Sequence, residues 1–139
     1  MINLKQLILI GIIILFAVTT HGKEIRTIKG TGNTKVANKI LKSYTDNFGG
    51  GGPGSKYYKE FATPEYKLTR EIEVTKKTVR VKTDIYPDSE GKEEFGKNAC
   101  RQILSIIYGS DPDFNVLETV EVEGQNHSLL TWCEKLKRR

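Results

Sequence analysis

Two neighbouring segments in the middle of the chain alternate apolar and polar residues, and this alternation constrains the fold more than any other feature. The apolar members of the first segment are Tyr66, Leu68, Ile72 and Val74, and those of the second are Val79, Val81 and Ile85. A period of two is typical of a β-strand with one covered face. The short connection around Lys76 predicts that the two strands pair as a hairpin.

A helix is predicted directly after this hairpin. Pro87 ends the second strand, Asp88 or Ser89 can cap the helix, and the helix runs to about Tyr108, before Gly109. Its apolar residues are Phe95, Ala99, Cys100, Ile103, Leu104, Ile106 and Ile107. So broad an apolar face predicts burial against a sheet.

Two further strands follow, at about 116–123 and 128–133, with a turn between them. The predicted fold is therefore α+β: a small antiparallel sheet of about four strands, in the order β-β-α-β-β, with one main helix on one face. Gly30, Thr31 and Gly32 are interpreted as a loop.

Residues 1–22 are predicted to be a signal peptide or membrane anchor that forms an apolar helix. Lys5 precedes twelve apolar or small residues, from Leu7 to Val18, which is the length of a signal-peptide core. A spanning helix needs about 20 such residues, so an anchor would have to include the flanking positions. The expected location is extracytoplasmic, secreted or membrane-anchored through the N-terminus. Basic residues after Gly22 leave the orientation open.

Residues 23–48 are predicted to contain a basic amphipathic juxtamembrane helix, because Val36, Ile40, Tyr44 and Phe48 recur every four residues. Its lysines Lys35, Lys39 and Lys42 are candidate contacts to an anionic membrane surface. The alternative, which the pattern favours, is that the apolar stripe packs on the domain. Residues 49–56 are expected to be a Gly-rich linker and 57–139 the α+β domain.

The two cysteines, Cys100 and Cys133, are predicted to form a disulfide that joins the main helix to the last strand if the domain is outside the cytoplasm. Two separate buried thiols are the alternative. Because a strand alternates sides, Trp132 must face away from the helix if Cys133 faces it. The opposite register, with Leu130 and Trp132 in the core, would make the disulfide improbable.

The first register predicts a partner-binding face on the outer side of the sheet. Its candidate residues are Trp132, Leu130, Leu117, Arg80 and Lys82. An exposed tryptophan among mixed charges is typical material for a binding site.

Several functional classes find little support. The net charge of +5 is dispersed among acids, which disfavours nucleic acid as a partner. Gly54, Ser55 and Lys56 stand in the wrong order for a nucleotide-binding loop. No metal or other cofactor is predicted, since His127 and the cysteines lack a recognised ligand spacing.

The leading hypothesis is a non-enzymatic, exported or membrane-tethered domain that recognises a protein or surface partner. One alternative is a small secreted hydrolase with a site assembled around His127. The other is a structural subunit of a membrane assembly. Whether the chain is an enzyme at all is left open.

Overall fold

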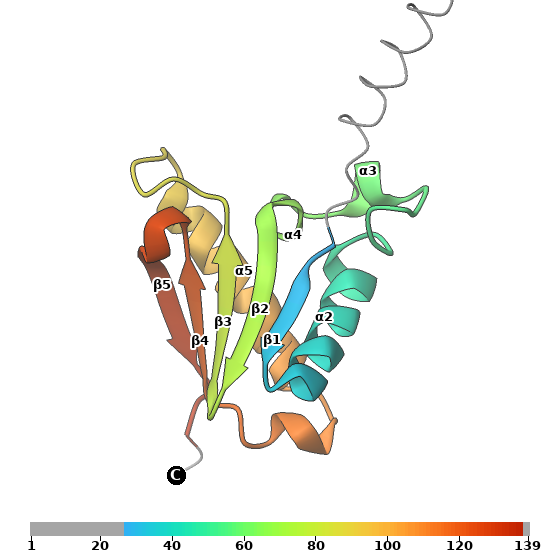
Figure 1. Cartoon of the computed structure of the whole chain (residues 1–139), viewed down its shortest axis with the longest axis vertical. Helices are drawn as coiled ribbons and strands as arrows, with labels where there is room; N and C mark the ends of the chain where they lie inside the picture. The colour runs from blue at the N-terminus through green and yellow to red at the C-terminus, as the bar shows by residue number, and fades with distance from the viewer. Residues whose placement is uncertain (1–26, 138–139) are drawn as a thin grey trace, which may run out of the picture.

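The computed structural model describes residues 27–137, which form a twisted five-stranded sheet with helices against it (Figure 1). The strands, in the order in which they lie side by side, are β1 (Lys29–Gly32), β2 (Thr69–Thr75), β3 (Thr78–Thr83), β4 (Thr119–Glu123) and β5 (Leu129–Glu134). The spatial order equals the chain order, so every strand pairs with its neighbours in sequence.

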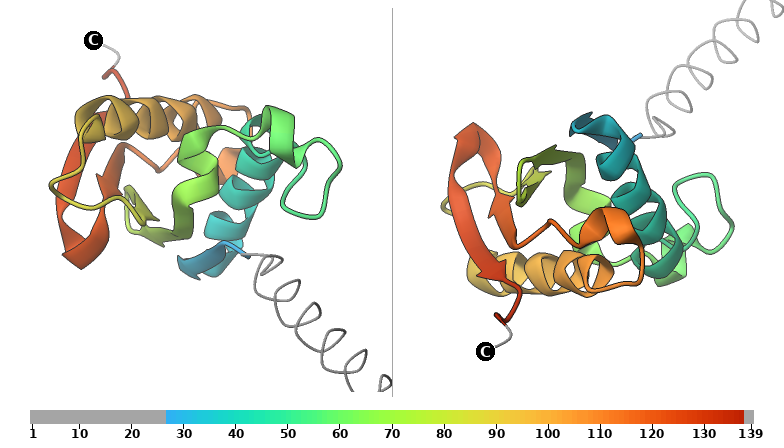
Figure 2. Two further views of the ribbon diagram at one scale, coloured as in Figure 1. Left: turned by 90° about the horizontal axis from the view of Figure 1, so that it is seen from above. Right: turned by 90° about the horizontal axis from the view of Figure 1, so that it is seen from below.

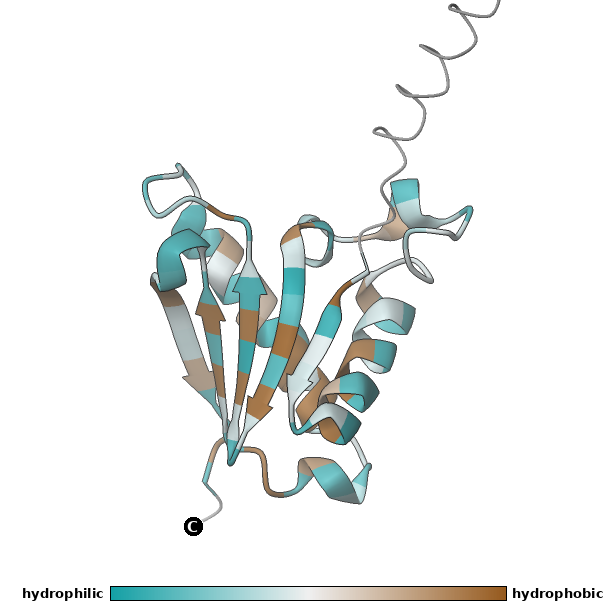
Figure 3. Ribbon diagram, in the orientation of Figure 1, coloured by the Kyte–Doolittle hydropathy of each residue, from teal (hydrophilic) through white to brown (hydrophobic). Residues whose placement is uncertain are grey.

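Two long helices, α2 (Thr34–Phe48) and α5 (Lys92–Ile107), pack side by side on the sheet (Figure 2). Between them and the sheet lies the core, which includes fully buried Ile40, Ile72, Val81, Ile103 and Val122. Burying a side chain of this size contributes about 1.5–3 kcal/mol. Figure 3 shows hydrophobic and hydrophilic residues alternating along β2, β3 and β4, which is the pattern of one buried and one open face.

The α+β class and the main helix agree with the prediction, but the sheet is mixed rather than antiparallel. The hairpins β2–β3 and β4–β5 are antiparallel, whereas β1 pairs with β2 and β3 pairs with β4 in parallel. Each parallel pair is joined by a segment that contains a helix, α2 or α5. A crossing helix returns the chain to the end of the sheet where the previous strand began, so the next strand runs parallel to it.

The fifth strand, β1, occupies the stretch that was interpreted as a loop. It contains two glycines and no large apolar residue, so it carries no alternation that could reveal it. A Cβ atom at Gly30 would lie 2.3 Å from Oδ1 of Asn38 and 3.3 Å from Cβ of Ala37 on α2, so glycine lets β1 and α2 approach closely. Residues 29–32 thus form a strand that packs closely on α2 without large side chains.

The start of the first predicted strand is instead helical. Tyr66 and Leu68 belong to the short helix α4 (Pro64–Leu68), and β2 begins only at Thr69. Thr63 caps α4 by accepting a hydrogen bond from the Tyr66 amide, and Pro64 stands in the first turn. These local helix signals outweigh the alternation of the apolar residues.

The apolar stripe of α2 is buried in the core. Val36, Ala37, Ile40 and Tyr44 are its buried residues, and Asn33 caps its first turn. After α2 comes the glycine-rich stretch, in which Gly50, Gly51 and Gly52 all have positive φ angles, followed by the one-turn helix α3 (Tyr58–Phe61). Hydrogen bonds from the Gly51 and Gly52 amides to the carbonyls of Thr45 and Gly49 fold this stretch back on the end of α2.

The apolar leader predicted at 1–22 lies outside the described residues. Between residues 27 and 137, no helix has both the length and the hydropathy needed to cross a membrane.

Candidate functional site

A disulfide between α5 and β5 fixes the orientation of the last strand. Cys100 and Cys133 are bonded, as predicted, with Cα atoms 6.2 Å apart. Cys133 therefore faces α5, and Trp132 faces the opposite side of the sheet, where 57% of it is exposed. Of the two registers that the sequence allowed, the structure has the one with Trp132 outside. A disulfide of this kind is consistent with an extracytoplasmic location.

The side of the sheet opposite α2 and α5 is here called the open face. It is formed by these residues of four adjacent strands: Glu71, Glu73, Arg80, Lys82, Glu121, Glu123 and Trp132. The strand register places Arg80 directly opposite the two acids Glu73 and Glu121, and it places Trp132 opposite Glu121. Opposite charges at such positions stabilise a sheet.

Arg80 is the centre of an ion-pair network on the open face. Its guanidinium lies 2.6 Å from Glu73, 3.1 Å from Glu121 and 3.2 Å from Glu123. Lys82 lies 2.9 Å from Glu71 and 3.5 Å from Glu73, and thereby extends the network to β2. The Thr31 hydroxyl of β1 donates a further hydrogen bond to Glu71 at 3.0 Å.

The network favours the charged forms of Lys82 and Glu71. The hydrogen bond to Glu71 raises the pKa of Lys82 above its ordinary value, although burial opposes this rise. For Glu71, burial is the largest influence and raises the pKa, but hydrogen bonds from Lys82 and Thr31 outweigh it and the pKa is lowered. A general acid or base needs a pKa moved towards neutrality. These groups are shifted the other way, which suits a fixed charged surface and not proton transfer.

Two of the five predicted partner-binding residues do not lie on the open face. Leu117 is 1% exposed and belongs to the core. β4 starts only at Thr119, so Leu117 lies in the turn before the strand, where its amide bonds to the Phe114 carbonyl. Its predicted placement on the outer face, based on alternation from 116 onward, is therefore wrong.

Leu130 is also placed differently from the prediction. It is partly buried against the core, close to Gly96 of α5. A register shift between β4 and β5 near Val122 and Glu123 interrupts the alternation, so Leu130 does not share a face with Trp132. Arg80, Lys82 and Trp132 remain as the predicted residues that the structure brings together.

The lysines predicted to contact a membrane lie on α2, and two of them already have acidic partners. Lys39 Nζ is 2.8 Å from Asp113, which lies within the short 3₁₀ helix η1 (Pro112–Phe114), and 3.1 Å from Asp111, which caps that helix. Lys35 is 3.8 Å from Asp113. The hydrogen bond to Asp113 raises the pKa of Lys39, and the same bond lowers the pKa of Asp113. Lys42 is exposed on the next turn of the helix.

His127 lies on an open turn, the 3₁₀ helix η2 (Gln125–His127), and its side chain is 80% exposed. Its Nδ1 atom is 3.7 Å from Glu123, while the neighbouring Ser128 hydroxyl donates to the Gln125 carbonyl. Within the described residues, no group of three or more His, Cys, Asp or Glu side chains is arranged to hold a metal ion. This geometry gives no support to a hydrolytic site around His127.

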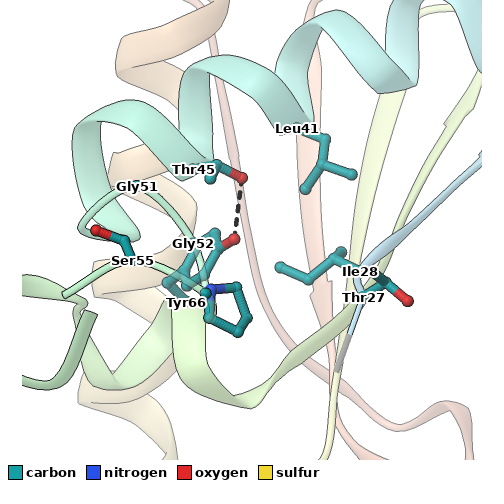
Figure 4. A pocket seen from close by; sticks show the side chains of 10 residues that line it. Thr27, Ile28, Leu41, Thr45, Gly51, Gly52, Ser55 and Tyr66 are labelled. Carbon is teal, nitrogen blue, oxygen red and sulfur yellow. Dashed lines mark hydrogen bonds between the residues drawn. The ribbon is translucent and has the colours of Figure 1, made fainter. Parts of the chain in front are cut away.

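A cavity of about 500 Å³ lies at the junction of the N-terminal end of the described chain, α2 and the glycine-rich loop (Figure 4). Its lining consists of Thr27, Ile28, Leu41, Thr45, Gly51, Gly52, Pro53, Gly54, Ser55 and Tyr66. Thr45 and Tyr66 share a hydrogen bond of 2.9 Å at its wall. The walls offer hydroxyls and apolar surface but no carboxylate, lysine or histidine. Sequence reasoning missed this cavity, and the glycine run is the signal that marks its rim.

Comparisons with protein-family models, curated proteins and solved structures found no match for this chain.

Proposed function

We propose that this chain is a non-enzymatic binding domain that recognises a protein partner through the open face, with Trp132 as the central contact. The observation that carries the proposal is the position of Trp132. It is a large aromatic side chain, more than half exposed, beside a network of charges that are already fixed. Tryptophan is enriched among the residues that dominate binding energies at interfaces.

The charge of the open face indicates the chemistry of the partner. In the network, the four carboxylates of Glu71, Glu73, Glu121 and Glu123 face two cations, Arg80 and Lys82. The acidic excess favours a partner surface with an apolar contact for the indole ring and basic side chains around it. Because the ion pairs hold their own side chains in place, binding orders few new rotamers.

The test uses Trp132 itself, because it is the one tryptophan of the sequence. Candidate partners are collected by crosslinking in the native compartment with wild-type, Trp132→Ala and Tyr86→Ala chains. Tyr86 is 60% exposed on a loop beyond the open face and serves as the matched control. The expected partner is lost with Trp132→Ala, retained with Tyr86→Ala, and shifts the Trp132 emission to shorter wavelength when the purified proteins are mixed.

A partner that binds wild type and Trp132→Ala with equal affinity, and leaves the tryptophan emission unchanged, would show that the open face is not the binding site. Charge reversal at Glu121, which lies directly opposite Trp132 in the strand register, removes part of the acidic excess and gives a second readout. It should weaken binding while the disulfide and the circular dichroism spectrum persist.

A further inference from the structure

The end of the domain that carries α3 and the glycine-rich loop presents an exposed aromatic pair surrounded by lysines. Tyr57 is 51% exposed and Phe61 is 63% exposed, and their ring centroids are 6.0 Å apart. We call Tyr57, Phe61, Lys56, Lys59 and Lys67 the α3 surface. It lies at the upper end of the molecule in Figure 1, opposite the end that carries η1.

Two lysines of the α3 surface, Lys56 and Lys67, lie beside tyrosine rings. Lys56 Nζ lies 4.9 Å from the centre of the Tyr57 ring, and Lys67 Nζ lies 5.6 Å from that of Tyr58. Lys67 also donates a hydrogen bond to the Lys59 carbonyl. Tyr58 packs against the core and contacts Tyr66, which fixes α3 to the domain.

The charge of this surface is positive. From Gly49 to Leu68 its exposed charged residues are Lys56, Lys59, Lys67 and Glu60, because Glu65 is buried and accepts a hydrogen bond from Gln102. Exposed tyrosine and phenylalanine with lysines around them match the chemistry of a bilayer interface. There, aromatic rings enter the headgroup layer and lysines pair with anionic lipids.

The N-terminal end of the described chain lies on the same side of the domain as the α3 surface. Thr27 and Ile28 line one cavity together with the glycine-rich loop, so the N-terminal end of the described chain lies beside that loop (Figure 4). In the sequence, the apolar run ends at Val18, nine residues before Thr27. Nine residues reach at most about 30 Å. A membrane that holds the apolar run therefore lies within about 30 Å of Thr27, on the side of the domain that carries the loop.

We infer that the α3 surface contacts the surface of an anionic lipid bilayer. This assignment moves the membrane contact away from the start of α2. Lys35 and Lys39 lie there, at the opposite end of the helix, and pair with Asp111 and Asp113. The contact leaves the open face and Trp132 available, so it is independent of the function proposed above.

A single-tryptophan reporter in the full-length chain tests the inference. Trp132→Phe removes the native tryptophan, and Phe61→Trp places a new one on the α3 surface. The control reporter is Val116→Trp in the same background, because Val116 is 54% exposed and closely follows η1, which lies at the other end of the domain. Both chains are reconstituted in phosphatidylcholine vesicles with and without phosphatidylserine, in which the phosphatidylcholine carries brominated acyl chains that quench tryptophan.

The expected result is that the reporter at position 61 loses about half of its emission or more in phosphatidylserine-containing vesicles, since interfacial side chains lie about 5–10 Å deep. Quenching should be weaker without phosphatidylserine, and the reporter at position 116 should remain unquenched. Equal quenching of both reporters, or none at position 61, would overturn the inference.

Charge reversal separates the lysines of the α3 surface from basic residues elsewhere. Lys56→Glu with Lys59→Glu should reduce the quenching at position 61 roughly twofold or more, because each lysine is attracted to anionic lipid. Lys35→Glu with Lys76→Glu changes the net charge equally at the opposite end of the domain and should leave the quenching unchanged. If the two pairs behave alike, anionic lipid is not the partner of the α3 surface.

Discussion

Glu71 couples the charge network of the open face to pH. Its folded-state pKa lies below 4.5, since hydrogen bonds from Lys82 and Thr31 outweigh the effect of burial. The unfolded chain therefore binds the proton at higher pH than the folded chain does. The stabilisation by Glu71 is complete above the unfolded pKa and is lost as the pH falls through the folded pKa.

We therefore expect Glu71→Gln to lower the free energy of unfolding by about 1 kcal/mol at pH 7. The difference from wild type should shrink as the pH falls through the lowered pKa of the folded state, below which the wild-type carboxylate is protonated as well. Urea unfolding at pH 7 and at pH 3 measures both values. Glu118→Gln is the control, because Glu118 and its partner Lys77 are 53% and 62% exposed. A difference that is as large at pH 3 as at pH 7 would contradict the role of the charge.

At this scale the sequence predicted side-chain directions only where the alternation is unbroken. The assignment of Cys133 to the helix side and Trp132 to the outer side follows from a period of two within β5. The sides on which Leu130 and Leu117 lie were not predicted correctly. A register shift interrupts the period of two at Leu130, and β4 begins only after Leu117. The pairing of Arg80 with Glu121 on β4 could not be predicted, since the order of parallel neighbours is set by the whole sheet.

At the level of elements, the sharp turn from β1 into α2 depends on Gly32. Its φ angle is +71°, and a Cβ atom there would lie 2.2 Å from the Val74 carbonyl oxygen on the neighbouring strand. Gly32→Ala is expected to lower the free energy of unfolding by roughly 2 kcal/mol or more, because the backbone strain and the collision add.

Gly54→Ala is the matched control for that substitution. A Cβ atom at Gly54 would have no other atom within 4 Å, and the residue lies in the same half of the chain. Its replacement should change the stability by no more than about 0.5 kcal/mol. Chemical denaturation of the two variants checks the contrast. Equal effects at both positions would mean that the β1–α2 turn relaxes freely.

The sequence could predict those elements whose apolar residues recur at a regular spacing. Long periodic segments, such as α2, α5 and the β2–β3 hairpin, reveal themselves through their apolar spacing. β1 has no such spacing, because two of its four residues are glycines and Gly30 packs closely on α2. Without β1, the parallel pairing with β2 could not be foreseen, and the predicted sheet had one strand too few.

At the scale of the whole molecule, the open face and the α3 surface lie on different sides of one core. The long helices cover the side of the sheet opposite the open face, and α3 lies at the end where the described chain begins (Figure 1). A domain held at a bilayer by the α3 surface would still present Trp132 sideways to a partner. The proposed binding and the inferred membrane contact are thus compatible in a single molecule.

The Cys100–Cys133 disulfide stabilises the whole domain and also holds in place β5, the strand that carries Trp132 on the open face. It joins cysteines 33 positions apart and ties the edge strand β5 to α5. Loop-closure entropy for such a length predicts a stabilisation of about 3–4 kcal/mol. Cys100→Ala with Cys133→Ala should therefore lower the free energy of unfolding by that amount, and reduction of the wild type should do the same. Reducing the double variant, as a control, should change nothing.

The edge strand should respond first, because β5 pairs with β4 on one side alone. Amide hydrogen exchange in β5 is expected to accelerate more than exchange in β2 and β3 when the disulfide is reduced. Since β5 carries Trp132, its indole should become more accessible to iodide at the same time. Unchanged exchange in β5 after reduction, with the thiols verified by mass, would show that packing alone holds the strand. If β5 does loosen, a reducing environment should weaken partner binding before it unfolds the domain.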